Sequence, residues 1–194
     1  MLVEGQRRGH LGPGPVLSHV RRALDLGSAF DQPPNRAIDL GSGGGLPGLP
    51  LALAWPDTRW LLLEGSATRA GFLDRAIQDL DLTHRVSVVA SRAEIAGRGG
   101  LRSTMDAVIA RSFAAPGPTA ECAAPFLVPG GLLVVSEPPG GRPERWDPAG
   151  LRSLGMALGP RRSTPTSFQV ILQELPCPER FPRRVGIPAK RPLF

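Results

Sequence analysis

The sequence lacks tyrosine altogether and contains only two cysteines, three histidines and one lysine. Cys122 and Cys177 stand far apart, and no metal-ligand spacing surrounds either of them. We therefore expect reduced thiols, a cytoplasmic protein and no bound metal. No apolar run approaches the ~18 residues that a membrane span needs, and no signal-peptide pattern opens the sequence. We accordingly expect no membrane partner.

The basic side chains are almost all arginine. Lys190 is the only lysine among 23 basic residues, so 22 are arginine, and the formal net charge is +6. Guanidinium groups fork to phosphates and base edges, which favours a nucleic-acid partner. A GC-rich genome would also enrich arginine, and we give both explanations similar weight. The length of 194 residues predicts one domain with a sizeable core, and we expect a monomer.

The most informative stretch is an apolar run that enters an acid and then a glycine-rich turn. Four glycines there let the backbone turn sharply and approach a ligand closely, and a proline suits the start of a helix. Strand, turn and helix form a cradle in which N–H groups at the helix end face a nucleotide-type ligand. The stretch reads Ala37-Ile38-Asp39-Leu40-Gly41-Ser42-Gly43-Gly44-Gly45-Leu46-Pro47-Gly48.

Two acids indicate which nucleotide this cradle holds. Gly43, Gly45 and Gly48 satisfy the dinucleotide pattern G-x-G-x-x-G. However, a carboxylate at Asp39 would repel a pyrophosphate and attract the sulfonium and ammonium groups of S-adenosylmethionine. Glu64 ends the next apolar run, where an acid can accept hydrogen bonds from both ribose hydroxyls. The alternatives are a structural turn at Asp39 and a solvated strand end at Glu64.

The pattern along the chain predicts one α/β domain with a mostly parallel sheet covered on both faces. We expect an N-terminal arm and short helix over 1–35, the ligand-binding domain over 36–175 and a basic Pro/Arg-rich tail over 176–194. Residues 1–14 should be a mobile arm, and the tail should either lie against the domain or stay extended. Strands are predicted at 37–40, 59–64, 86–90, 107–110, 132–136 and 168–174, and helices near 16–24, 47–54, 67–80, 93–96, 119–127 and 149–158.

Several segments, in order, resemble the glucose-inhibited division protein B family. The glycine turn extended to Pro50 is similar to the family's first motif, and Leu63-Glu64-Gly65-Ser66 to its second. Ser91-Arg92-Ala93-Glu94 and Ile109-Ala110-Arg111-Ser112-Phe113-Ala114 resemble the segments after the third and fourth strands. Phe181 to Pro192 resembles the basic tail of some members. The resemblance implies a Rossmann-like class I methyltransferase with a seven-stranded sheet, which methylates guanine N7 in 16S ribosomal RNA using S-adenosylmethionine.

The sequence also departs from the family pattern. Family members carry a longer helical region before the first motif, with Asn-Leu-Thr and His-x-x-Asp-Ser segments. Only 38 residues precede Asp39 here, and His10 and His19 do not restore those segments. We therefore expect a divergent member with an intact cofactor site and a shortened N-terminus.

The motifs and the resemblance together assign the candidate site residues. Arg111 follows the fourth strand and is the catalytic candidate, since it could position cofactor or substrate; methylation of N7 needs alignment and no general base. Arg111 could instead be a surface arginine, Glu94 an ordinary helix acid, and Phe113 a core residue or a base-stacking platform. Cofactor contacts are expected from Asp39, Gly41, Ser42, Gly43, Gly45, Leu46, Glu64, Gly65, Ser66, Arg92, Ala93, Glu94 and Arg111, and RNA contacts from Arg69, Arg183, Arg184, Lys190 and Arg191.

Three other functions remain open from the sequence. The same cofactor could serve a small molecule, a protein or another RNA. The cradle could belong to a catalytically silent module that binds cofactor or RNA. A nicotinamide-dependent oxidoreductase would also use a glycine-rich turn of this kind.

Overall fold

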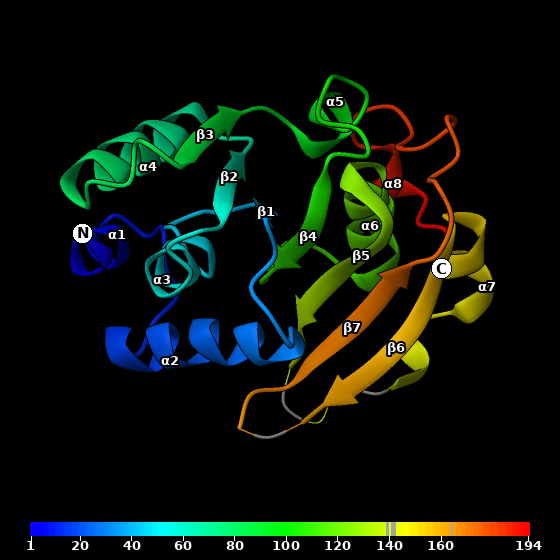
Figure 1. Ribbon diagram of the computed structural model, residues 1–194, viewed down its shortest axis with the longest axis horizontal. Helices are drawn as coiled ribbons and strands as arrows, with labels where there is room; N and C mark the ends of the chain where they lie inside the picture. The colour runs from blue at the N-terminus through cyan, green and yellow to red at the C-terminus, as the bar shows by residue number, and fades with distance from the viewer. Residues whose placement is uncertain (139, 141–142, 164) are drawn as a thin grey trace.

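A seven-stranded sheet organises the computed structural model, which describes residues 1–138, 140, 143–163 and 165–194 (Figure 1). The strand order is β3-β2-β1-β4-β5-β7-β6, and β7 runs in the direction opposite to the other six described strands. This arrangement confirms the expected mostly parallel sheet. The strands are β1 (Arg36–Leu40), β2 (Arg59–Glu64), β3 (Val86–Ala90), β4 (Met105–Ala110), β5 (Leu127–Ser136), β6 (Met156–Arg162) and β7 (Phe168–Gln173).

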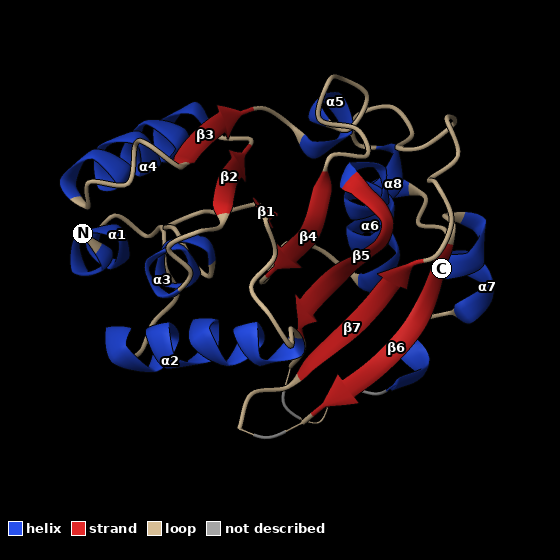
Figure 2. Ribbon diagram, in the orientation of Figure 1, coloured by secondary structure: helices blue, strands red, loops and turns tan. Residues whose placement is uncertain are grey.

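Helices cover both faces of the sheet, as Figure 2 shows. One face packs against α2, α3 and α4, and the other against α5, α6 and α7, so each face has its own apolar core. The described helices are α1 (Leu2–Arg7), α2 (Val16–Leu26), α3 (Gly48–Ala54), α4 (Ala67–Asp79), α5 (Ala93–Ala96), α6 (Pro116–Ala123), α7 (Pro148–Ser153) and α8 (Ile187–Lys190), with single 3-10 turns at Gly27–Ala29, Ala124–Phe126 and Pro143–Arg145. None of these helices is long and apolar enough to span a bilayer.

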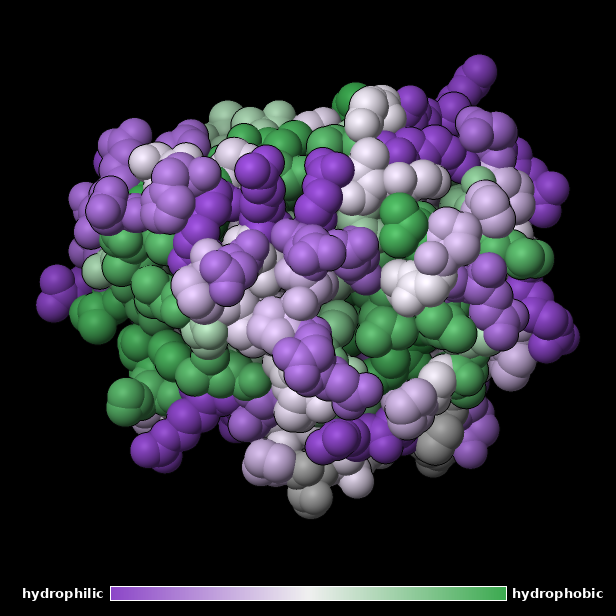
Figure 3. Space-filling view, in the orientation of Figure 1, coloured by the Kyte–Doolittle hydropathy of each residue, from purple (hydrophilic) through white to green (hydrophobic). Residues whose placement is uncertain are grey.

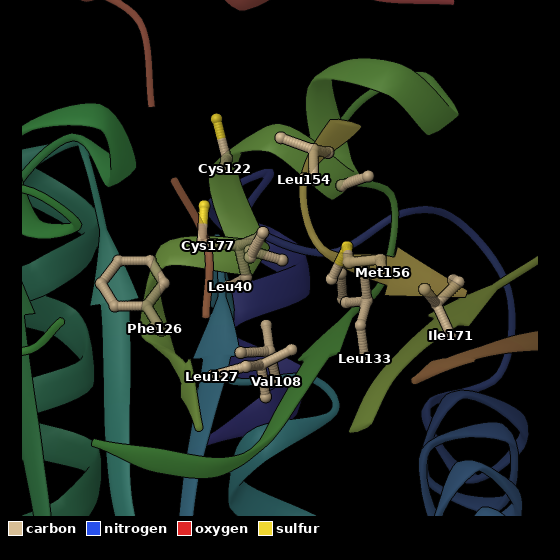
Figure 4. Packing of buried hydrophobic residues seen from close by; sticks show 14 of the residues in the cluster. Leu40, Val108, Cys122, Phe126, Leu127, Leu133, Leu154, Met156, Ile171 and Cys177 are labelled. Atoms are coloured by element: carbon tan, nitrogen blue, oxygen red, sulfur yellow. The ribbon is translucent and has the colours of Figure 1, made fainter. Parts of the chain in front are cut away.

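The core beneath α6 is built from β-strand side chains that alternate toward that face. Leu40 of β1, Val108 of β4 and Leu133 of β5 lie together there (Figure 4). Cys122 and Cys177 join the same core as free, buried thiols. Burial raises the pKa of the Cys177 thiol to about 11. At neutral pH these cysteines therefore act as apolar packing residues.

Helix α2 is amphipathic and carries a histidine on its buried face. His19, Ala23 and Leu26 follow helical spacing and are buried, whereas Leu17 and Leu24 point outward. Figure 3 shows apolar residues gathered over α2 and α3, on a side of the molecule that carries other apolar areas as well. The buried face of α2, formed by His19, Ala23 and Leu26, therefore holds His19 against the rest of the domain.

Three predicted elements differ from the structure. Strand β5 begins at Leu127 and not at residue 132, because the strand continues through an irregularity at residues 129–131. The helix expected over 119–127 spans Pro116–Ala123. The helix expected near 149–158 ends at Ser153, and Gly155 adopts a left-handed φ of 77° before β6, which the sequence pattern missed. Each difference lies near a glycine or a proline, where the sequence is compatible both with an element that continues and with one that ends.

The first residues also differ from the expected mobile arm. Residues Leu2–Arg7 form α1, and Gly5 is buried against Phe72, with 3.2 Å between its ideal Cβ position and Phe72 Cζ. The His10 imidazole stacks edge-on against the same ring, with centroids 5.0 Å apart. The amino-terminal segment is therefore packed on α4 and the glycine turn.

The C-terminal tail lies against the domain, beside α5, α6 and α7 (Figure 1). Arg183 forks onto Glu121, a fully buried residue of α6, at distances of 2.6 to 3.1 Å, and its own backbone N–H donates to the same carboxylate. Arg98 and Arg102 donate to carbonyls of Pro182 and Phe181. The expected RNA contact by Arg183 is therefore replaced by a structural ion pair.

We predict that Arg183→Ala strongly destabilises the protein. The substitution leaves the Glu121 carboxylate buried without its cation, which typically costs about 3–5 kcal/mol. The neighbouring Arg184→Ala is the matched control, because Arg184 is exposed and surface substitutions usually change stability by about 0.5 kcal/mol or less. Urea unfolding followed by circular dichroism measures both, and equal free energies of unfolding would contradict the structural role of Arg183.

Candidate cofactor site

A cavity of about 620 Å³ opens at the carboxyl ends of β1, β2 and β4. This edge is where open α/β sheets bind ligands. The turn after each strand contributes to the wall, and segments from both ends of the chain complete it. The lining comprises His10, Leu11, Gly12, His19, Gly41, Ser42, Gly43, Gly44, Leu46, Leu63, Glu64, Gly65, Ser66, Arg69, Ser91, Arg92, Ala93, Glu94, Arg111, Ser112, Phe113, Ala114, Pro118, Cys122, Pro188 and Ala189.

The glycine turn after β1 needs glycine for two reasons. Gly41 and Gly43 adopt left-handed φ values of 77° and 53°, which strain other residues. A Cβ on Gly41 would also lie 2.6 Å from Phe113 Cδ2. The predicted contacts at Gly41, Ser42, Gly43 and Leu46 lie on the cavity wall, whereas Gly45 packs against Leu49 away from it.

Asp39 lies beneath the turn and does not line the cavity, unlike the expectation that it faces the cofactor. Its carboxylate is fully buried, and Oδ2 accepts a hydrogen bond of 2.8 Å from the Gly48 N–H. Oδ1 has no hydrogen-bond partner among the described residues. Burial raises the pKa of Asp39 to about 7, although the Gly48 hydrogen bond opposes this shift. Asp39 therefore ties the turn to the start of α3.

Glu64 ends β2 and does line the cavity, with a side chain only 4% exposed. Oε2 accepts from the Gly43 N–H at 2.9 Å, and Oε1 accepts from the Ser66 N–H at 2.8 Å. Arg69 donates to Oε1 at 2.8 and 3.0 Å. Burial alone would raise the pKa of Glu64, but these three donors together hold it below its usual value. The site thus contains a buried, ionised carboxylate.

The pairing with Glu64 changes the interpretation of Arg69. We expected Arg69 to contact RNA, but its guanidinium is committed to the Glu64 carboxylate at the cavity wall. Arg184, Lys190 and Arg191, the remaining predicted RNA contacts, are exposed on the tail. The structure therefore does not bring the five predicted RNA contacts together on one surface.

The opposite wall combines the segment after β3 with the tail. Arg92, Ala93 and Glu94 line the cavity, as do Gly65 and Ser66 across from them. The Gly186 N–H donates to Glu94 Oε1 at 2.9 Å, and the following Pro188 and Ala189 also reach the lining. The sequence did not predict this contribution of the tail, because no local pattern connects Glu94 with Gly186, which follows it by 92 positions.

A histidine from α2 fixes Arg111, which follows β4. Arg111 Nη2 lies 2.6 Å from His19 Nδ1, while His19 Nε2 lies 3.1 Å from the Pro13 carbonyl oxygen. A carbonyl only accepts, so Nε2 carries the proton and Nδ1 accepts from the guanidinium. Burial, together with Arg22 nearby, lowers the pKa of Arg111 from its ordinary value. His19 therefore positions the predicted catalytic residue, a role the sequence did not indicate.

The arrangement suits an adenosyl ligand that also carries an anionic group. Glu64 supplies acceptors for a ribose diol, and the glycine turn permits close backbone approach. Arg111 supplies a fork for a carboxylate or phosphate. Within the described part of the chain, no cluster of three or more histidine, cysteine or acidic side chains is arranged to hold a metal ion.

Comparison with known proteins gives consistent matches over most of the chain. The family model GidB, rRNA small subunit methyltransferase G, matches residues 15–137. The ribosomal RNA small subunit methyltransferase G of Rubrobacter xylanophilus is 37% identical, with 100% of this chain and 80% of the relative covered. That of Parasynechococcus marenigrum is 36% identical, with 81% of this chain and 67% of the relative covered.

Solved structures share the fold at low sequence identity. TYW2 from M. jannaschii in complex with AdoMet gives a TM-score of 0.59 at 17% identity, covering 79% of this chain and 73% of that chain. TYW2 from P. horikoshii in complex with MeSAdo gives 0.59 at 16% identity. The match covers 84% of this chain but 62% of that one, so the chain spans less than two thirds of its length.

We predict that Asp39→Asn removes a pH-dependent loss of stability. The unfolded carboxyl ionises near its ordinary pKa of 3.8, whereas the folded one stays protonated until about pH 7. Wild-type protein should therefore lose stability as pH rises from about 4 to 7, by up to about 1.4 kcal/mol per pH unit from this group. The asparagine is neutral in both states, so the difference in unfolding free energy between variant and wild type should grow across that window and then level off. Asp74→Asn, at an exposed position of α4, is the control, and an equal slope for both variants in urea titrations would refute the assignment.

We also predict that His19→Ala weakens binding of S-adenosylhomocysteine. Loss of the Nδ1 acceptor frees the Arg111 guanidinium, and a hydrogen bond to a charged group is worth enough for about a tenfold change in affinity. His19→Asn keeps an acceptor near the Nδ1 position and should retain most of the affinity. Isothermal titration calorimetry compares both with His84→Ala, whose histidine is exposed and distant from the lining. Equal affinities for His19→Ala and His84→Ala would contradict the positioning role.

Proposed function

The chain belongs to the rRNA small subunit methyltransferase G family, and on this premise we propose that it methylates guanine N7 in 16S ribosomal RNA, with S-adenosylmethionine as the methyl donor. The observation that carries the cofactor assignment is the ionised, buried Glu64 at the end of β2, beside the glycine turn. The family carries the substrate assignment.

The residues around the cavity divide the recognition of the cofactor. Within the described part of the chain, Glu64 Oε2 has one partner, so that oxygen retains capacity for a ribose hydroxyl. The wall formed by Ala93, Glu94 and Pro188 suits the adenine ring. Arg111, held by His19, suits the carboxylate of the methionine moiety or a phosphate of the RNA. S-adenosylmethionine supplies an electrophilic methyl group when bound.

The protein's contribution to the reaction is alignment. Guanine N7 carries an available lone pair and no proton, so no side chain must remove one before attack. The rate gain then comes from holding the nitrogen in line with the methyl group, which is an orientation effect. The guanidinium of Arg111 is suited to this task because His19 fixes its direction from the buried face of α2.

The RNA contacts and the cellular setting belong to the same proposal. The exposed Arg184, Lys190 and Arg191 remain candidates for phosphate contacts, whereas Arg69 and Arg183 serve structural pairs. We propose a cytoplasmic monomer that acts on the small ribosomal subunit, where this substrate is found.

We predict that the protein transfers labelled methyl groups into 16S ribosomal RNA of small subunits from a strain lacking the family enzyme. The product should be 7-methylguanosine at one position, detected by chain cleavage at the methylated base. Arg111→Ala should lower turnover by about 100-fold, as loss of a positioned charge in a catalytic site commonly does.

Arg59→Ala is the matched control for this assay. Arg59 is an exposed arginine at the start of β2, at the end of the strand opposite the cavity. Its variant should keep wild-type turnover. Absence of incorporation beside an active family member would refute the proposed substrate, and equal rates for Arg111→Ala and Arg59→Ala would refute the role of Arg111.

A further inference from the structure

A second cavity, of about 450 Å³, adjoins the cofactor cavity. Both are lined by the same four consecutive residues after β4, so the Arg111–Ser112–Phe113–Ala114 segment forms a wall that they share. The second cavity extends from there past the end of β5 to the loop before β7. Its described lining includes Arg22, Arg111, Phe113, Glu137, Arg145 and Trp146.

The chemistry of this cavity centres on Glu137. It follows β5 directly, is 7% exposed, and is the one acid among the described lining residues. Oε1 accepts from the Trp146 indole N–H at 2.9 Å, and Oε2 accepts from Arg145 Nη1 at 2.6 Å. Among the described residues each oxygen has one partner, and each retains the capacity to accept one more hydrogen bond.

We propose that this second cavity takes the target guanine, with Glu137 accepting hydrogen bonds from its N1–H and its 2-amino group. The inference rests on the proposed function and specifies how its substrate is selected. Guanine is the base that presents two adjacent donors on its Watson–Crick edge, and a carboxylate with two acceptor oxygens complements them. Adenine presents a ring acceptor at N1, which the same carboxylate would repel.

The cations around Glu137 complement the rest of the guanine edge. O6 lies next to N1–H on the ring, and it is an acceptor that suits an arginine. Arg22, Arg111 and Arg145 all line the cavity. Because N1 and the 2-amino group are held on the Glu137 side, N7 is left free to face the wall shared with the cofactor cavity.

The negative charge of Glu137 also favours the transfer itself. As N7 bonds to the methyl carbon and the carbon–sulfur bond breaks, the positive charge leaves the sulfur and appears on the purine. No proton moves in this step. The Glu137 carboxylate lies in the cavity that holds the purine, where the charge develops, whereas Glu64 and Glu94 line the cavity that the charge leaves.

Engagement of the Watson–Crick edge requires a base that is not paired. The guanine must therefore be single-stranded or turned out of its helix before it enters. Phe113, which lines both cavities, is the aromatic side chain placed to contact the extruded ring.

The first test uses the unmodified protein and the indole N–H of Trp146 as a local probe. In ¹⁵N-detected NMR with S-adenosylhomocysteine present, guanosine 5′-monophosphate should shift this resonance more than those of Trp55 and Trp60, which lie outside the second cavity. Inosine 5′-monophosphate lacks the 2-amino group and should bind at least about tenfold more weakly, because a site built for a donor rejects an analogue without it. Adenosine 5′-monophosphate should produce no saturable shift. Equal responses to the three nucleotides, or no response at Trp146, would overturn the proposal.

The second test measures turnover on small subunits. Glu137→Gln keeps an acceptor for Trp146 but removes the charge and places an amide donor in the cavity, so we expect a loss of at least about tenfold. Glu144→Gln is the control, an exposed acid in the same loop, and should keep wild-type turnover. Glu137→Gln loses the ion pair with Arg145 and should melt at a somewhat lower temperature, but both variants should remain folded at the assay temperature and keep their affinity for S-adenosylhomocysteine.

The outcomes separate the inference from the function on which it rests. Wild-type turnover with an equally active Glu137→Gln variant would refute the role of Glu137 and leave the proposed function standing. An inactive wild-type protein that still selects guanosine 5′-monophosphate at Trp146 would refute the ribosomal substrate and retain the guanine site.

Discussion

Two buried carboxylates hold the turn after β1, and the shape of the cofactor cavity depends on them. Asp39 accepts from the Gly48 N–H below the turn, and Glu64 accepts from the Gly43 N–H beside it. Backbone N–H groups that are buried in this way need acceptors, and unmet ones are costly. The two acids meet that need from neighbouring strands and so hold the turn in a shape that suits a ligand. Such preorganisation reserves the binding energy of the ligand for alignment. The acids also differ in state. Burial raises the pKa of Asp39, whereas the hydrogen bonds from Arg69, Ser66 and Gly43 outweigh burial and lower the pKa of Glu64.

The arginine-rich composition has a structural use as well as a chemical one. Arg183 neutralises a buried glutamate, and Arg98 and Arg102 donate to carbonyls of the tail. A guanidinium offers five donors in a planar fork, so one side chain can meet several acceptors where the backbone has no regular partner. The proline-rich tail leaves many carbonyls without helix or strand partners, and these arginines supply donors to them. A basic tail can thus be part of the domain wall, and net charge alone does not separate this use from nucleic-acid binding.

The sequence predicted features that depend on neighbouring residues correctly and missed features that depend on contacts between distant segments. The strand that enters Asp39, the glycine turn and Glu64 at the end of β2 were predicted from local pattern, and the structure brings the last two to one cavity. The role expected for Asp39 was different, since its burial depends on the approach of α3 to β1 through Gly48. Strand β6 was missed because its residues, Met156–Arg162, include both glycine and proline and are a strand only through pairing with β7. Such pairing energy comes from a neighbour and is not encoded in the segment itself.

The sequence by itself determined the fold class, the order of the central elements and the chemistry of the turn, because apolar periodicity, glycine and acids act over a few residues. Only the tertiary structure decided which side chains share the site. His19 meets Arg111 from 92 residues away, and Glu94 receives the Gly186 N–H across the same separation. It also decided that Glu137 faces a cavity that adjoins the cofactor site. Contacts of this kind arise when whole helices and strands pack together, and their partners are selected by shape and burial over distances that no local pattern records.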